Sequence, residues 1–339
     1  MITEIINSND KKAMQRAADL IKSGGVVAFP TETVYGLGAN AFDGAAVEGI
    51  FTAKGRPADN PLIVHIENMN MIESIAVGIP DDFYLLYEKF MPGPLTVVLH
   101  KNKKISDAVT AGLDTVAVRF PRHRTAAELI KKSGCPIAAP SANISAHVSP
   151  TTAEHVFADL NGRIPMIIDG GECSVGIEST ILDLTGDTPV ILRPGAITLD
   201  MLRKTLKEVA EVECRAETPK APGMKYRHYS PNAELRLTGN RGEAAAFYDE
   251  AAAAGKNVAL IVKASNAPYY GSRNIFVIPD DAKGYAKKIY ALLRLAETSS
   301  DTIICESPET SGAGASVLNR LNKAVGKSGF KTDGRSETL

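Results

Sequence analysis

The segment "KGRPADNPLIVHI", residues Lys54–Ile66, contains the end of a helix, a rigid turn and the start of a strand. It follows the helix-like run "GAAVEGIFTAKG" and ends in the apolar run "LIVHI". Two prolines, Pro57 and Pro61, cannot continue a helix, and they therefore separate the two elements. A helix that passes through a short turn into a strand is the repeating unit of an α/β fold.

The same alternation extends on both sides of this segment. Strand-like runs are "VVAFP", "LTVVLH", "TVAVRFP", "PIAAPSAN", "MIIDGG", "STILDLTG" and "PVILRPG". Some are separated by helical runs such as "TAAELIKKSG", and others follow one another directly. This pattern predicts a first domain over residues 1–212 with helices around a mixed sheet.

The composition changes at residues 213–232, which we predict to be an interdomain linker. The run "ECRAETPKAPGMKYRHYSPNAE" holds three prolines and the aromatic and basic residues Tyr226, Tyr229, Lys225 and Arg227. Linkers usually consist of small and polar residues. This composition therefore fits a plain linker and a segment that rests on a ligand or surface about equally well. Strand-like runs "ELRLTG", "NVALIVK", "NIFVIP" and "DTIICE" then predict a smaller, Rossmann-like α/β domain over residues 233–339.

Composition narrows the class of function. The chain has 339 residues, of which 44% are hydrophobic, and a net charge of −1, so no global field attracts nucleic acid or membrane. It has no tryptophan and only 6% aromatic residues, which leaves few side chains on which RNA bases could stack. No apolar run approaches membrane-spanning length, and four scattered cysteines form no C-x-x-C pair. We therefore expect a cytoplasmic protein with no protein metal site and no membrane contact.

Lys54 and Arg56 are the first candidate site residues. Cations at the end of a helix complement its macrodipole, which is the simplest explanation for both. An anion clamp is the alternative, because a lysine point charge beside the planar fork of an arginine suits phosphate. In that case Asn60 and the two prolines would hold the turn.

Further polar residues follow the ends of predicted strands, where open α/β sheets bind ligands. Arg119 lies in an apolar strand, and a buried arginine needs an anion, for which a ligand carboxylate is one candidate. His65, inside "LIVHI", is more often a core histidine, and Ser149 could simply cap a helix. The other members are Thr33, Ser141, Asn143, Ser145, Glu178, Ser179, Thr180 and Arg193. Such a site, rich in hydroxyls and cations, suits activation of a phosphate ester better than hydrolysis by a triad.

The motifs "PTETVYGLGANA", "KGRPADNPLIVHI", "APSANISAHVSPTT", "GIESTILDL" and "ILRPGAI" resemble the YrdC-like domain of threonylcarbamoyl-AMP synthases. The family signature K-x-R followed by S-x-N falls on Lys54, Arg56, Ser141 and Asn143. The linker "APGMKYRHYSP" and the second domain resemble the two-domain, Sua-type form. The resemblance therefore implies a YrdC-like open twisted mixed sheet joined by a long linker to a Rossmann-like domain.

The resemblance also implies site residues and a reaction. Family positions for ATP fall on Lys54, Arg56, Asn60, Thr115, Ser141, Asn143, Ser149, Arg193 and Tyr226, with Lys54 and Arg56 as catalytic residues. Family positions for L-threonine fall on Thr33, His65, Arg119, Ala139 and Ser179. The implied products, from L-threonine, bicarbonate and ATP, are threonylcarbamoyl-AMP and pyrophosphate, used to modify tRNA beside the anticodon.

Partners follow from the same resemblance. Mg²⁺ would arrive with ATP, held by phosphates and water. Other proteins would transfer the threonylcarbamoyl group, so that contact with tRNA would be indirect. Tyr226 and its neighbours would close over the site.

Two alternatives remain at this point. One is an RNA-binding module of the YrdC-like type, for which the basic runs "LHKNKK" and "RFPRHR" could supply charge. The other is a carbamoyl-phosphate-using carbamoyltransferase, which the lack of C-x-x-C pairs disfavours.

Overall fold

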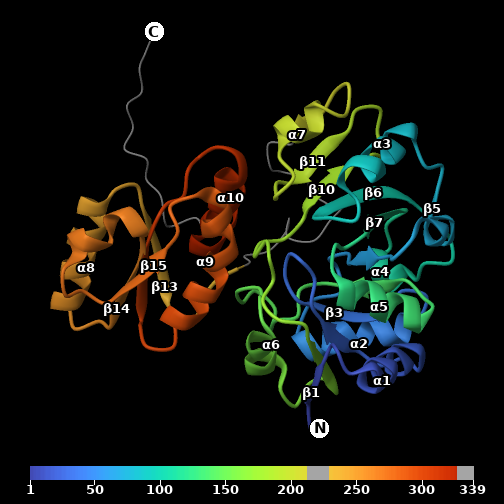
Figure 1. The fold of residues 1–339 in the computed structure, drawn as a ribbon, viewed down its shortest axis with the longest axis horizontal. Helices are drawn as coiled ribbons and strands as arrows, with labels where there is room; N and C mark the ends of the chain where they lie inside the picture. Colours follow the sequence, from blue (N-terminus) through green and yellow to red (C-terminus); the bar gives the residue numbers. More distant parts are fainter. Residues whose placement is uncertain (212–228, 327–339) are drawn as a thin grey trace.

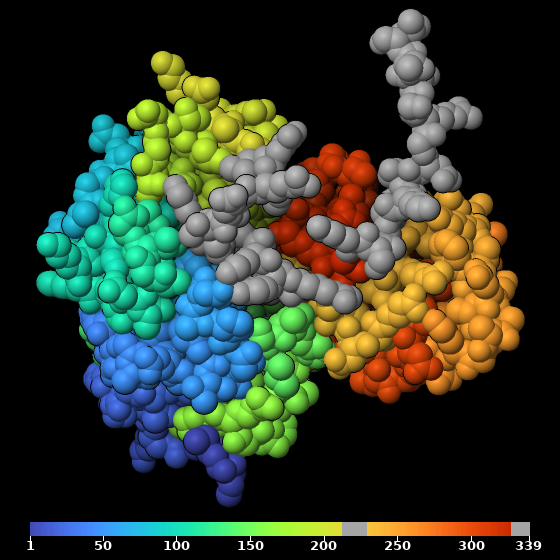
Figure 2. All heavy atoms as spheres, turned by 180° about the vertical axis from the view of Figure 1, so that it is seen from behind, coloured from blue at the N-terminus to red at the C-terminus, as the bar shows by residue number. Residues whose placement is uncertain are grey.

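The computed structural model describes residues 1–211 and 229–326. Figure 1 shows two lobes, a larger one from the N-terminal half in blue to yellow-green and a smaller one in orange and red. The space-filling view in Figure 2 shows the same two lobes from behind. This arrangement confirms the predicted α/β fold with a second, smaller α/β domain.

A mixed sheet forms the first lobe. Within the described residues it has twelve strands. In spatial order they are β1 (Glu4–Asn7), β9 (Met166–Asp169), β2 (Val27–Phe29), β3 (Gly36–Asn40), β8 (Ile137–Ala139), β4 (Ile63–His65), β7 (Thr115–Arg119), β6 (Leu95–Lys101), β10 (Thr180–Asp183), β11 (Val190–Arg193) and β12 (Ala210–Glu211), with β5 (Ala76–Val77) paired to β6. The pairs β1–β9, β2–β9, β4–β7, β6–β10 and β11–β12 are parallel, and the others are antiparallel.

Helices cover both faces of this sheet. They are α1 (Lys11–Lys22), α2 (Gly44–Lys54), the 3₁₀ helix η1 (Met69–Ser74), α3 (Asp81–Phe90), α4 (Asp107–Thr110), α5 (Arg124–Ser133), α6 (Ala153–Leu160) and α7 (Leu199–Arg203). Helices α1 and α5 share one core with Val27 and Phe29, whereas α2, α3 and α6 share another with Val26 and Ala28. Alternate residues of one strand thus face opposite cores, as the strand period requires.

The helix of the opening segment has clear limits. The Asp43 side chain accepts hydrogen bonds from the backbone N–H groups of Ala45 and Ala46, which caps the start of α2. Gly55 ends it with a left-handed φ of 60°, a conformation that favours glycine. Lys54 and Arg56 therefore flank the exact point where the helix turns toward β4.

The second lobe is a parallel four-stranded sheet, in the described residues, with helices on both sides. Its strand order is β13 (Glu234–Thr238), β16 (Thr302–Glu306), β14 (Val258–Lys263) and β15 (Ile275–Ile278). Its helices are α8 (Arg241–Ala253), the 3₁₀ helix η2 (Ala264–Tyr270), α9 (Ala282–Ala296) and α10 (Gly312–Val325). Figure 1 shows α9 and α10 on the side facing the first lobe and α8 on the far side.

The two lobes share a hydrophobic core. Val34, Val148 and Ile177 of the first lobe belong to the same cluster of buried residues as Ile289 and Val317 of the second. The backbone at Gly176 lies so close to α9 that a Cβ there would meet the Ala286 carbonyl oxygen at 2.5 Å. At these contacts the two lobes therefore pack like a protein interior.

Several elements were not predicted, among them the strand β3 at residues 36–40 and the helix α3 at residues 81–90. The glycines of β3 lie close to other parts of the protein, since a Cβ at Gly38 would meet Ile137 Cγ2 at 2.5 Å. The described ranges contain no helix long and apolar enough to cross a membrane.

Candidate functional site

A pocket opens where the strands β4, β7 and β8 meet the loop that follows β2. We call it the site pocket. Its lining residues are Thr31, Thr33, Val34, Tyr35, Gly36, Arg56, Ile63, His65, Arg119, Ala139, Pro140, Ser141, Glu178, Ser179, Arg193 and Tyr229. The strand register explains the grouping, because His65 pairs with Arg119 and Ile63 pairs with Ala139 across neighbouring strands.

The structure brings together most of the predicted site residues. Those that line the site pocket are Thr33, Arg56, His65, Arg119, Ala139, Ser141, Ser179 and Arg193. The first and the last of them are more than a hundred residues apart in the sequence. All five positions predicted for L-threonine are in this group.

Arg119 has a protein partner for its charge. Its Nη2 lies 2.9 Å from Glu32 Oε2, and both side chains are about 5% exposed. Neither Glu32 oxygen accepts a hydrogen bond in the described residues. The contact is therefore an ion pair in which no N–H group points directly at the carboxylate. The sequence left a ligand carboxylate as one candidate for the anion that Arg119 needs, and the structure shows that Glu32 is such an anion.

His65 is a neutral member of the site pocket. Burial, followed by the charge of Arg119, lowers the pKa of His65 to about 3. Its Nδ1 lies 3.1 Å from the Ile63 carbonyl oxygen, and the Phe29 ring meets it edge-on at 5.8 Å. At neutral pH this side chain can hydrogen-bond a ligand without adding charge.

Lys54 and Arg56 point to different places. Arg56 lines the site pocket and donates to the Asn60 carbonyl oxygen at 3.1 Å. Lys54 is 2% exposed, and its Nζ donates to the carbonyl oxygens of Ser141 (2.5 Å) and Asn143. Burial and then the charge of Arg56 lower the pKa of Lys54 well below its usual value. Lys54 thus supports the loop that carries Ser141, and the pocket wall in the described residues does not include it.

Two other predicted ATP positions also bond to groups of the protein, and a third does not line the site pocket. Asn143 Nδ2 donates to the carbonyl oxygens of Ile144 and His147, at 2.8 and 2.9 Å. Ser149 Oγ donates to Glu178 Oε1 at 2.6 Å. Thr115 lies at the end of β7 opposite Arg119, away from the part of the site pocket that the structure describes.

The remaining predicted ATP positions are Asn60 and Tyr226. Asn60 is 1% exposed, and its side-chain amide has no hydrogen-bond partner in the described residues. Such a buried amide is costly unless something binds it, so it fits a ligand contact. Tyr226 lies outside the described residues. Tyr229, from the same aromatic and basic run, lines the site pocket.

Sequence reasoning missed the contribution of the second lobe. Arg320 from α10 and Tyr290 from α9 both reach Glu178, which lines the site pocket. A signal existed for Arg320, because it lies on the buried face of its helix together with Val317, Leu321 and Ala324. A charged residue on an apolar face needs a partner, but the sequence could not show where that partner lies.

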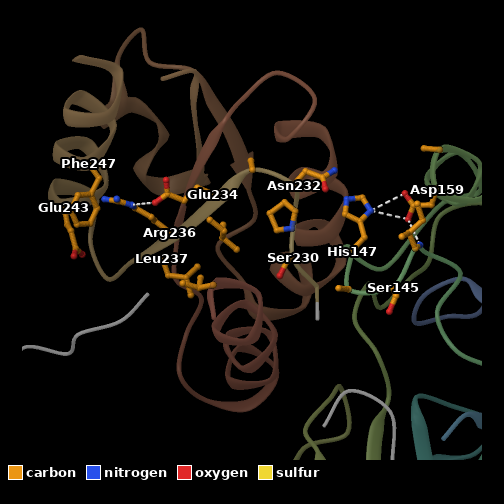
Figure 3. A pocket seen from close by; sticks show the side chains of 17 residues that line it. Ser145, His147, Asp159, Ser230, Asn232, Glu234, Arg236, Leu237, Glu243 and Phe247 are labelled. Atoms are coloured by element: carbon orange, nitrogen blue, oxygen red, sulfur yellow. Dashed lines mark hydrogen bonds and ion pairs between the residues drawn. The ribbon is translucent and has the colours of Figure 1, made fainter. Parts of the chain in front are cut away.

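A larger cavity of about 1240 Å³ lies between the lobes, lined by residues that include Ser145, His147, Asp159, Asn232 and Phe247. Figure 3 shows that the His147 ring points toward Asp159 at the edge of this cavity. This interdomain cavity contains none of the predicted site residues except Ser145, a loop serine to which no ligand was assigned. We therefore place the chemistry in the site pocket, where three arginines and several hydroxyls converge.

Comparison with known families matches both lobes. Residues 19–195 match a family described as "Telomere recombination", and residues 197–326 match the "Threonylcarbamoyl-AMP synthase, C-terminal domain" family. Together these models cover most of the described chain.

Individual relatives agree along the whole length. The Threonylcarbamoyl-AMP synthase of Pyrococcus abyssi is 47% identical over 316 residues, which are 91% of this chain and 93% of the relative. The protein of that name from Bacillus subtilis is 43% identical and covers 96% of both chains. The solved structure of P. abyssi Sua5 complexed with L-threonine has a TM-score of 0.89, 43% identity, and coverage of 96% of this chain and 98% of that one. The chain belongs to the threonylcarbamoyl-AMP synthase family.

Proposed function

We infer that this chain is an L-threonylcarbamoyladenylate synthase, which forms threonylcarbamoyl-AMP and pyrophosphate from L-threonine, bicarbonate and ATP. The observation that carries this conclusion is the site pocket, in which Arg56, Arg119 and Arg193 converge with hydroxyl groups. Cations and hydroxyls are what an adenylate-forming reaction needs to hold a carboxylate and a triphosphate.

The reaction divides into two chemical steps. The threonine amine first condenses with bicarbonate to a carbamate, with loss of water. A carbamate oxygen then attacks the α-phosphorus of ATP, and the bond to pyrophosphate breaks. Because the attacking oxygen is already an anion, the second step needs no general base. Catalysis is then positioning together with charge neutralisation.

Threonine binds, in this proposal, at the end of the site pocket formed by β4, β7 and β8. Arg119, held by Glu32, shares its guanidinium with the threonine carboxylate. Neutral His65 and the Ser179 hydroxyl lie beside it as hydrogen-bonding groups, with Thr33 and Ala139 completing the wall.

The triphosphate binds at the end that holds Arg56, Ser141 and Arg193. Arg193 is 4% exposed and donates to the carbonyl oxygen and the hydroxyl of Ser179, so it arrives at the pocket with a fixed orientation. Lys54 Nζ donates to the carbonyl oxygen of Ser141 and thereby supports the loop of that residue. We keep Asn60, Thr115, Asn143, Ser149 and Tyr226 as further contacts of ATP.

Mg²⁺ fits this site only as a companion of the nucleotide. The described residues contain no group of three or more histidine, cysteine, aspartate or glutamate side chains that could hold a metal ion. Glu178, a carboxylate that lines the site pocket, is paired with Arg320. Glu32, between the lining residues Thr31 and Thr33, is paired with Arg119. In this proposal phosphate oxygens and water would hold the ion, which would neutralise phosphate charge. We also propose a cytoplasmic location and transfer of the product to tRNA by other proteins.

The test is pyrophosphate release from ATP by the purified protein, with L-threonine and bicarbonate each present or omitted. Release that requires both supports the proposal. Release without threonine would mean a different acceptor on the same chemistry. Absence of release from folded protein with magnesium, together with salt-sensitive micromolar binding of tRNA, would favour the RNA-binding alternative.

A further inference from the structure

The second lobe contributes two buried side chains that contact a residue in the wall of the site pocket. Both contact Glu178, which is 6% exposed and lines that pocket. Tyr290 Oη donates to Glu178 Oε2 at 3.0 Å, and Arg320 Nε donates to the same oxygen at 3.2 Å. Tyr290 and Arg320 are themselves fully buried. The Glu178 carboxylate therefore has one of its counter-charges, Arg320, in the other domain.

The other oxygen of Glu178 serves the first lobe. Glu178 Oε1 accepts the hydroxyl proton of Ser149 at 2.6 Å. One carboxylate thus connects α9 and α10 of the second lobe with the loop that carries Ser149. If the carboxylate moves, the Ser149 hydroxyl loses its acceptor, and if the carboxylate takes a proton, it becomes a weaker acceptor and can itself donate.

The same two side chains also border Tyr229, another pocket residue. The rings of Tyr229 and Tyr290 stack with centroids 5.9 Å apart and planes 15° from parallel. The Arg320 guanidinium carbon lies 5.8 Å from the centroid of the Tyr229 ring. Such contacts fix the ring as well as the carboxylate.

The charge state of Glu178 depends on this arrangement. Burial alone would raise the pKa of Glu178, but Arg320 and then Arg193 lower it below its usual value. Without Arg320, desolvation opposes only the charge of Arg193 and the hydrogen bonds, so the pKa would rise. The carboxylate would then either take up a proton or draw on Arg193, which the proposed function needs for ATP.

We propose that Arg320 and Tyr290 are positioning residues of the active site, which hold Glu178 ionised and oriented so that Ser149 and Tyr229 are set for the nucleotide. The second domain thereby completes the ATP end of the site pocket. This inference rests on the proposed function through the role of Ser149 in binding ATP. A purely structural role for the same contacts predicts loss of stability with no change in the pH dependence of catalysis.

The first experiment compares pH profiles of kcat/KM for ATP in four proteins. They are the wild type, Arg320→Met, the double variant Arg320→Met with Glu178→Gln, and Arg294→Met. Arg294 is the matched control, because it forms another buried interdomain ion pair, with Asp159 at 2.7 Å, and neither residue lines the site pocket.

We expect a new pH step only in Arg320→Met. Its kcat/KM for ATP should fall at least about tenfold on the acid side of the raised Glu178 pKa and recover as pH increases. The double variant has no carboxylate to titrate and should lack the step. A profile without a step in Arg320→Met, or the same step in Arg294→Met, would overturn the proposal.

A second pair of variants, which disturb the core less, tests the proposal if Arg320→Met does not fold. Tyr290→Phe removes only the hydroxyl that contacts Glu178. Tyr285→Phe is its match on the same helix, fully buried, with a hydroxyl that donates to the Glu306 carbonyl oxygen. Tyr290→Phe should raise KM for ATP at least about threefold more than Tyr285→Phe, with KM for threonine changed equally little in both. Equal effects of the two variants on KM for ATP would overturn the inference.

Wild-type turnover separates this inference from the proposed function. If the wild type releases no pyrophosphate, the proposed function fails, and the dissociation constant of ATP is measured by calorimetry with the same variants. A pH-dependent loss of ATP affinity confined to Arg320→Met would still support the positioning role. Absence of ATP binding by the wild type would overturn both.

Discussion

Arg119 and Glu32 show how one residue pair sets the threonine end of the site pocket. Both side chains are buried, and each is the principal opposite charge of the other within the described residues. A buried ion pair adds little stability as a pair, but removal of one member leaves an uncompensated charge. The pair therefore fixes Arg119 in place before any ligand arrives.

We predict that Arg119→Gln raises KM for threonine at least about 30-fold, because truncating one partner of a buried charge pair at a binding site costs about 2–5 kcal/mol. Steady-state pyrophosphate release at varied threonine measures the change. The control is Arg273→Gln, which breaks the surface pair with Asp249 and should leave KM within about twofold. A wild-type KM in Arg119→Gln would show that threonine does not bind this guanidinium.

The protonation state of the buried His65 imidazole can be predicted. Because burial holds its pKa near 3, the imidazole stays neutral at every pH used for assay. Proton NMR of the imidazole should therefore show no titration of His65 between about pH 5 and 9. Assignment by comparison with His65→Gln identifies the signal, and a midpoint near 6.5 would contradict the burial argument.

At the scale of elements, Gly195 keeps two segments of the pocket wall together. It follows β11, and a Cβ there would lie 2.4 Å from the backbone nitrogen of Thr180 and 2.7 Å from the carbonyl carbon of Ser179. Ser179 lines the site pocket. The close approach of two backbones thus determines where the Ser179 hydroxyl lies.

Gly195→Ala should push the segment of Ser179 out of place. We expect a loss of about 1–3 kcal/mol in the free energy of unfolding, as for other overpacked sites, together with lower kcat/KM for threonine. Urea denaturation and steady-state kinetics measure the two effects. Gly186→Ala, which adds a Cβ with nothing within 4 Å, is the matched control and should be close to neutral. Equal behaviour of the two variants would contradict the packing argument.

Local propensity and periodicity make some features predictable from the sequence. They are the turn at Pro57 and Pro61, the alternation of helices and strands, and the position of site residues near the ends of strands. The site position of His65 came from the family resemblance, since one histidine in an apolar strand is usually structural.

Other features could not be predicted from the sequence, because they depend on contacts distant along the chain. Lys54 turns toward the carbonyl oxygens of Ser141 and Asn143, 87 and 89 residues away. Arg320 meets Glu178 across 142 residues. Residue types alone do not reveal which buried cation serves which carboxylate, and this is why the support of Glu178 by the second lobe was missed.

For the whole molecule, a charged cluster beside the interdomain cavity links the two lobes. His147 Nδ1 lies 3.2 Å from both carboxylate oxygens of Asp159 in α6, and its Nε2 lies 2.9 Å from Glu297 Oε1 at the end of α9. Arg294 of α9 completes the cluster by pairing with Asp159. Burial lowers the pKa of His147, but the hydrogen bonds to the two carboxylates outweigh it and raise the value to about 9.

This cluster should make the stability of the two-lobed molecule depend on pH. Because the folded pKa of His147 is raised, its contribution is complete below pH 6.5 and is lost as pH rises through about 9. We predict that the melting temperature falls between pH 6.5 and 9.5 in the wild type and falls less in His147→Gln. Differential scanning calorimetry checks this, and parallel curves for the two proteins would contradict it.

His155 acts in the opposite sense. Burial and then the charge of Arg294 lower the pKa of His155 to about 4, so this residue removes stability as pH falls below 6.5.

The distance along the chain between Glu178 and Arg320 has a consequence for biosynthesis. A ribosome makes the chain from the N-terminus, so the first domain emerges and can fold long before residue 320 is added. Until then Glu178 has neither Tyr290 nor Arg320 as a partner. The nascent first domain would therefore carry an unfinished ATP pocket, and the enzyme would gain its full activity only when translation is almost complete.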